Sequence, residues 1–142
     1  MSTTIRQMLT QRAQVISVGP TAKVLDALKL MADLNVGAVL IIDGGRLVGI
    51  FSERDYARKV VLKGKASADT AVSDVMTSSL ITIDPGLTAD QAMVLMDEKH
   101  IRHLPVIEGD RVLGVISIRD VVHAVIAEQR FTIKELEKYI SS

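Results

Sequence analysis

The chain has 142 residues with 17 basic and 17 acidic side chains, contains no cysteine, and is only 3% aromatic. Its length suits one folded unit with an aliphatic core, and its zero net charge provides no long-range attraction to nucleic acid or to anionic membranes. The missing cysteines exclude disulfides, thiolate metal sites and cysteine nucleophiles.

The N-terminal segment, MSTTIRQMLTQRAQ, lacks the long apolar run of a signal peptide. No later stretch approaches the roughly 18 uninterrupted apolar residues of a membrane span. We therefore expect no membrane partner and a cytoplasmic location.

The sequence consists of two copies of one unit. Residues 15–55 align with residues 80–120 at a constant offset and without a gap. Upstream, the segment 5–10 matches the segment 72–77 at a different offset, so the first copy carries two extra linker residues. Neither copy alone has enough strands and helices to bury both faces of its sheet, so the two copies must pack together. We expect one domain at 5–65, a second at 70–125 and a helical tail at 126–142.

The sequence pattern of each copy predicts five elements in the order strand, helix, strand, strand, helix. A short apolar strand at 15–18 or 80–83 is followed by apolar residues at helical spacing, from Val24 to Met31 or from Ala89 to Met96. Two apolar runs then flank a Gly-containing turn, which predicts a β-hairpin. The predicted fold class is α/β (α+β), with two βαββα repeats packed as a pseudo-twofold pair.

The sequence of the tail predicts a short helix separate from the last helix of the second copy, because the segment Thr132–Glu135 (TIKE) has the residue pattern of a helix capping box. Ile133, Leu136 and Ile140 would line one side of that helix with little else to cover them. We therefore expect the protein to form a homodimer.

Each hairpin ends in Ser-x-x-Asp, at Ser52–Asp55 and again at Ser117–Asp120, with Arg54 and Arg119 inside the motif. One interpretation is a simple helix cap. The recurrence of Ser, Arg and Asp in both copies, with a glycine three residues earlier, favours a ligand. A serine hydroxyl at a helix N-terminus suits a phosphate or hydroxyl, and an aspartate accepts both hydroxyls of a ribose.

The segment from Arg102 to Val106 (RHLPV) places Arg102 and His103 at the entrance to a buried strand that contains Pro105. Arginine favours planar oxyanions, so a carboxylate or phosphate is a candidate ligand here. His100 and His103 have a spacing that allows metal chelation, but the helix should already be ending there and no third ligand is nearby. Because neither a nucleophile elbow nor a phosphate-binding loop appears, we expect no enzyme and no metal.

These motifs, in their order, spacing and duplication, resemble a tandem pair of cystathionine-β-synthase (CBS) domains of the stand-alone bacterial type. The resemblance implies two clefts for an adenosyl ligand: AMP, ADP or ATP, with NAD as a further candidate and S-adenosylmethionine as a less favoured one. It implies that one cleft uses Ser52, Asp55, Leu80, Ile81, Arg102 and His103. It implies that the other uses Ser117, Asp120, Val15, Ile16, Gly37 and Ala38.

The resemblance implies a regulatory signal-transduction module that binds an adenine nucleotide and modulates a partner protein of unknown identity. The alternative is a structural protein-interaction module without a ligand. Nucleic-acid binding is disfavoured by the zero net charge and the scarcity of aromatic residues. Arg102 and His103 align with Gly37 and Ala38 of the first copy, so we expect tighter phosphate binding in the cleft that contains Asp55.

Overall fold

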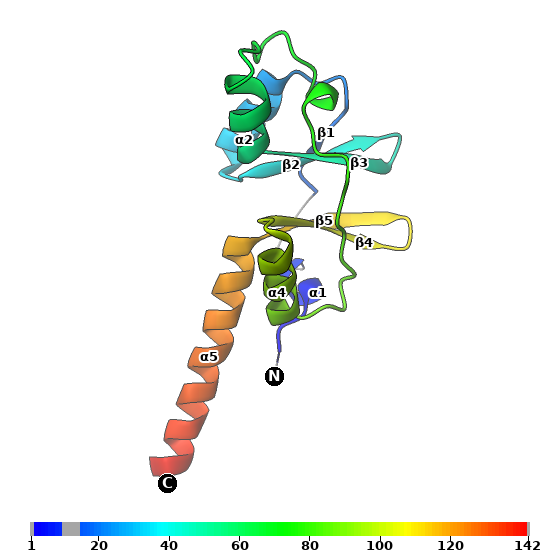
Figure 1. Cartoon of the computed structure of the whole chain (residues 1–142). Helices are drawn as coiled ribbons and strands as arrows, with labels where there is room; N and C mark the ends of the chain where they lie inside the picture. The colour runs from blue at the N-terminus through cyan, green and yellow to red at the C-terminus, as the bar shows by residue number, and fades with distance from the viewer. Residues whose placement is uncertain (1, 10–14, 142) are drawn as a thin grey trace.

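The first repeat folds around a three-stranded sheet in the computed structural model, which describes residues 2–9 and 15–141 (Figure 1). Its elements are β1 (Ser17–Val18), α2 (Val24–Leu34), β2 (Ala38–Asp43), β3 (Arg46–Ser52), α3 (Glu53–Asp55) and the π-helical turn η1 (Tyr56–Val61). β1 runs parallel to β2, which pairs antiparallel with β3. Gly44 and Gly45 both have positive φ in the hairpin turn, a conformation that favours glycine.

The second repeat has the same order of elements but lacks a formed first strand. The short helix η2 (Val72–Asp74) precedes it, and its elements are α4 (Ala89–Lys99), β4 (His103–Glu108), β5 (Arg111–Ser117) and α5 (Ile118–Ser141). β4 and β5 form an antiparallel hairpin. In Figure 1 the two hairpins lie next to each other, with α2 and α4 on their outer sides. The predicted α/β (α+β) class with two repeats is confirmed.

The prediction of a strand at 80–83 is wrong, since this segment makes only an isolated parallel bridge between Ile83 and Val106. The first repeat shows the reason. There, the backbone N–H of Leu40 donates to Ile16 O over 3.1 Å, which helps to hold β1 against β2. The residue at the position of Leu40 in the second repeat is Pro105, which has no N–H to donate. One ladder hydrogen bond is therefore lost and the strand is not formed.

Each repeat has its own aliphatic core, and the segment that precedes each repeat completes the core of the other. Ile5, in α1 (Ile5–Leu9), is fully buried in the second core, and its N–H donates to Leu87 O over 2.8 Å. Val72 is fully buried in the first core, and its N–H donates to Ala22 O over 2.8 Å. Each repeat thus contributes a segment to the core of the other, which holds the two repeats together. Residue 10, the last of the matching segment 5–10, lies outside the described residues.

The two sheets meet through a small apolar cluster, in which Ala38 and Leu40 of β2 pack with Ile50 of β3 and Val115 of β5. Val15 and Leu80 pack at its edge. This contact places the start of β4 close to the end of β3. The Ser-x-x-Asp motif of the first repeat therefore lies near residues 101–103 of the second.

The tail is one continuous extension of α5, so the expected second helix is wrong. The described helix runs from Ile118 to Ser141 and contains neither glycine nor proline. The hydroxyl of Thr132 donates to Glu128 O over 3.1 Å, one turn back in the same helix, and does not cap a new one. α5 extends away from the sheets (Figure 1). No described helix has the length and apolar content needed to cross a membrane.

Candidate functional site

Both Ser-x-x-Asp motifs form the predicted helix-capping arrangement. In the first, Asp55 N donates to Ser52 Oγ over 3.2 Å and Ser52 N donates to Asp55 Oδ2 over 2.9 Å. In the second, Asp120 N donates to Ser117 Oγ over 3.1 Å and Ser117 N donates to Asp120 Oδ2 over 2.9 Å. These paired bonds fix each carboxylate at the point where a strand passes into a helix.

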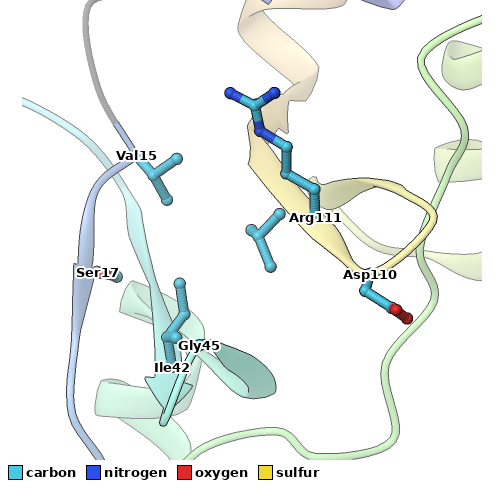
Figure 2. Close-up of a pocket in the computed structure, with 7 residues that line it drawn as sticks. Val15, Ser17, Ile42, Gly45, Asp110 and Arg111 are labelled. Atoms are coloured by element: carbon cyan, nitrogen blue, oxygen red, sulfur yellow. The ribbon is translucent and has the colours of Figure 1, made fainter.

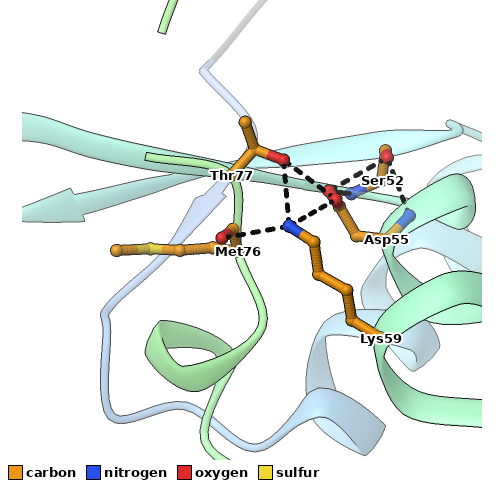
Figure 3. Close-up of polar contacts among 5 residues, drawn as sticks. All are labelled: Ser52, Asp55, Lys59, Met76 and Thr77. Carbon is orange, nitrogen blue, oxygen red and sulfur yellow. Dashed lines mark hydrogen bonds and ion pairs between the residues drawn. The ribbon is translucent and has the colours of Figure 1, made fainter. Parts of the chain in front are cut away.

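The Asp55 carboxylate has further partners, which Figure 3 shows. Its Oδ2 accepts from Ser52 Oγ over 3.0 Å, and its Oδ1 accepts from Thr77 Oγ1 over 2.9 Å. The Lys59 Nζ lies 3.1 Å from the same Oδ1. The Asp55 side chain is only 9% exposed, so these donors and the ammonium compensate for the water that the buried carboxylate has lost.

A pocket of about 620 Å³ opens beside this carboxylate, between the two repeats. The first motif forms one side of it and the start of β4 forms another. The lining residues are Gly37, Ile50, Ser52, Glu53, Arg54, Asp55, Arg58, Lys59, Thr77, Ile101, Arg102 and His103. The structure thus brings Ser52, Asp55, Arg102 and His103 together. Gly37, which the resemblance assigned to the other cleft, lines this pocket as well.

His103 lies between the two motifs. It is paired with Ser117 across the β4–β5 hairpin, yet it lines the pocket that contains Asp55. Burial lowers the pKa of His103; the carboxylates of Asp120 and Asp55 partly oppose this effect, and the nearby Arg102 adds to it. A methyl group at Gly37 would lie 3.3 Å from His103 Nε2, so the glycine leaves room for the imidazole.

The remaining predicted site residues lie in several environments. Leu80, Val15 and the buried Ala38 pack in the cluster between the sheets. Ile16 packs on the first core and Ile81 on the second. Pro105 is buried within β4 and Arg119 is exposed at the start of α5. The exposed Arg54 lines the pocket, where its guanidinium donates to His100 O over 3.0 Å.

A second pocket, of about 530 Å³, lies near the ends of the two hairpins (Figure 2). Its lining residues are Val15, Ser17, Ile42, Gly45, Asp110, Arg111 and Val112. Among the residues predicted for the second cleft, only Val15 belongs to this lining. Its position away from Ser117 and Asp120 makes the pocket beside Asp55 the better candidate for a ligand site.

Four polar residues of the Asp55 pocket were not among the predicted site residues: Glu53, Arg58, Lys59 and Thr77. Lys59 follows Asp55 by four residues, the spacing at which helical side chains meet, so this ion pair had a sequence signal. Thr77 reaches the site from the linker between the repeats. Its only sequence signal is that it matches Thr10 in the upstream alignment of the two copies.

The duplicated fold and the paired motifs agree with a comparison against known families. The family model described as CBS domain matches residues 5–62 and again 72–127. This chain belongs to the CBS domain family. It is a tandem pair of CBS domains, and the pocket beside Asp55 lies between the two members of the pair.

Relatives of this CBS pair have similar structures and sequences. A CBS-domain protein of Burkholderia ambifaria is 43% identical with a TM-score of 0.84, and the match covers 89% of this chain and 96% of that one. The mitochondrial CBS domain-containing protein CBSX3 of Arabidopsis thaliana is 43% identical over 122 residues; this chain spans 59% of its length, and 82% of this chain is matched. The CBS pair of protein MJ0100, solved with 5′-methylthioadenosine and S-adenosyl-L-methionine, shares the fold at 23% identity and a TM-score of 0.79, covering 90% of this chain and 99% of that one.

Proposed function

We propose that this CBS pair is a regulatory module that binds an adenine nucleotide in the pocket between Asp55 and Arg102, and that binding changes its interaction with a partner protein. The observation that carries the proposal is the composition of the pocket. A carboxylate suited to ribose hydroxyls lies in the same hollow as several cationic side chains suited to phosphate. Its volume of about 620 Å³ falls within the usual range for small-molecule sites.

The charges of the pocket favour an anionic ligand. Four side chains that are cationic at neutral pH line it, against two carboxylates, Glu53 and Asp55. The cations are Arg54, Arg58, Lys59 and Arg102. AMP, ADP and ATP place negative phosphate near these groups, and NAD is a further candidate. S-adenosylmethionine carries a sulfonium cation, which the same groups would repel, so we place it last.

The CBS pair of MJ0100 supports an adenosyl ligand, because that protein shares this fold and was solved with two adenosyl compounds. In this chain the cationic side chains of the pocket lining add a preference for a phosphate-bearing member of that ligand class. A ligand-controlled module needs no catalytic group, so we propose a regulatory protein and not an enzyme. We also propose that it is located in the cytoplasm.

The two Ser-x-x-Asp motifs should differ in phosphate binding. Arg102 and His103 line the Asp55 pocket, whereas the aligned residues of the first repeat are Gly37 and Ala38, which carry no charge. The motif at Asp120 therefore lacks equivalent phosphate ligands at these aligned positions. We propose that a charged nucleotide binds first beside Asp55 and that the motif at Asp120 binds it more weakly.

We also propose that the protein is a homodimer that pairs through α5. Ile133, Leu136 and Ile140 are 54%, 56% and 80% exposed, and their spacing places them along one side of the helix. Ile133 and Ile140 are seven residues apart, and Leu136 follows Ile133 by three residues. This spacing of isoleucine and leucine is typical of a two-stranded coiled coil. A second copy of the same helix would bury these side chains.

A thermal-shift series with AMP, ADP, ATP, NAD and S-adenosylmethionine tests the ligand proposal. A nucleotide present at about 100 times its Kd should add about 2.7 kcal/mol to the free energy of unfolding. Stabilisation by the phosphate-bearing compounds is the expected result. If none of the five compounds raises the Tm, the ligand proposal fails, and a structural protein-interaction module without a ligand takes its place.

A further inference from the structure

The Lys59 ammonium contacts the carboxylate of Asp55, the group that the proposed function assigns to the ribose. The Lys59 Nζ lies 3.1 Å from Asp55 Oδ1, and 3.4 Å from both Met76 O and Thr77 Oγ1 (Figure 3). An ionised carboxylate offers about four acceptor positions. Ser52 N, Ser52 Oγ, Thr77 Oγ1 and Lys59 Nζ already use them. A ribose hydroxyl that donates to this carboxylate therefore requires one of these donors to leave.

Lys59 is the donor that can leave at the lowest cost. Ser52 is held as the N-cap of the helix that follows it. Thr77 is held by two backbone hydrogen bonds with Ile50, of 3.0 and 2.9 Å. The Lys59 side chain is 42% exposed and carries its charge on a flexible four-carbon stem, so it can move without disturbing the backbone.

We propose that Lys59 is a specificity-determining residue that blocks the ribose side of Asp55 in the empty pocket and transfers its charge to phosphate when a nucleotide binds. This inference rests on the proposed function. Adenosine has no anion, so on binding it would displace the ammonium from Asp55 and leave it beside Arg58, another cation of the lining. AMP would replace the lost carboxylate with a phosphate. Lys59 thus opposes the nucleoside and supports the nucleotide.

The second repeat has an alanine where the first has Lys59. The position that aligns with Lys59 is Ala124, four residues after Asp120 on α5. Alanine neither blocks a carboxylate nor binds a phosphate. The blocking by Lys59 that we propose is therefore specific to the Asp55 site.

The test measures the affinities of AMP and adenosine, by calorimetry and by competition, for the full chain and for Lys59→Met. Methionine keeps most of the stem and removes the charge. We expect AMP to bind roughly tenfold more weakly and adenosine several-fold more tightly, because a charge-assisted hydrogen bond accounts for one to two decades of affinity. Lys59→Arg keeps a cation and should retain most of the preference for AMP. Lys63→Met, at an exposed lysine outside the pocket lining, is the matched control.

Opposite changes for the two ligands support the inference. An equal loss for both ligands, an unchanged ratio, or adenosine binding that does not improve in Lys59→Met would overturn it while leaving the proposed nucleotide site intact. A wild-type protein that binds neither AMP nor adenosine would overturn the inference, and if ADP, ATP and NAD also fail to bind, it would refute the proposed function as well. If Lys59→Met does not fold, the ratio measured for Lys59→Arg and for Lys59→Gln decides the question in the same way.

Discussion

Replacing Arg102 with alanine should separate the binding of phosphate from the binding of the nucleoside. Arg102 lines the pocket from the second repeat, whereas Asp55 is supplied by the first, so the change should leave the ribose partner in place. We expect AMP to lose affinity through the missing charge-assisted bond and adenosine to be nearly unaffected.

The size of the effect follows from the environment of Arg102. A hydrogen bond to a charged group contributes roughly 1.5 to 3 kcal/mol. Arg102 is exposed, so water screens its charge, and Arg54 and Arg58 remain in the pocket after the change. The lower end of the range applies, which corresponds to about a tenfold increase in the Kd for AMP.

Isothermal calorimetry with AMP and with adenosine measures both affinities on the same protein. Arg130→Ala, at an exposed arginine on α5, is the matched control and should change neither affinity. Equal weakening of AMP and adenosine would mean that Arg102 only supports the shape of the pocket. An unchanged AMP affinity would mean that the phosphate lies elsewhere. Either result would refute the reasoning.

Three other predictions concern the two motifs, His103 and the tail. In calorimetry, Asp55→Ala should remove the tighter AMP event while Asp120→Ala keeps it, and equal affinity at both motifs would contradict this asymmetry. Burial lowers the pKa of His103, so its contribution to stability is complete above about pH 6.5 and is lost as the pH falls; denaturant unfolding at pH 7.5 and 5.5 should show a smaller acid loss for His103→Gln than for the wild type. Light scattering should give a dimer for the full chain and a monomer for residues 1–130, and a monomeric full chain would contradict the α5 interface.

The sequence predicted the order of elements because the two copies support each other. The Ser-x-x-Asp capping could be expected from residue types alone, since both hydrogen bonds are local to four residues. Two local expectations failed for identifiable reasons. Pro105 removes a donor that the first repeat uses at Leu40, so no strand forms at 80–83. The capping pattern at Thr132 lies inside a helix that has no residue to interrupt it.

Long-range contacts within the site were harder to predict. Thr77 reaches Asp55 from 22 positions further along the chain, and only the folded linker brings the two side chains together. The packing of Ile5 in the second core is likewise a property of the assembled pair. Patterns along the sequence report local geometry, whereas these contacts depend on how the two repeats are packed.

The position of bound AMP is the most direct test of a nucleotide site between the repeats. A crystal structure of the full chain grown with saturating AMP would show it. We predict ribose hydroxyls at Asp55, with Lys59 displaced from that carboxylate, and the phosphate on the side of Arg102. An empty pocket beside Asp55, or AMP bound only at the motif that contains Asp120, would contradict the account.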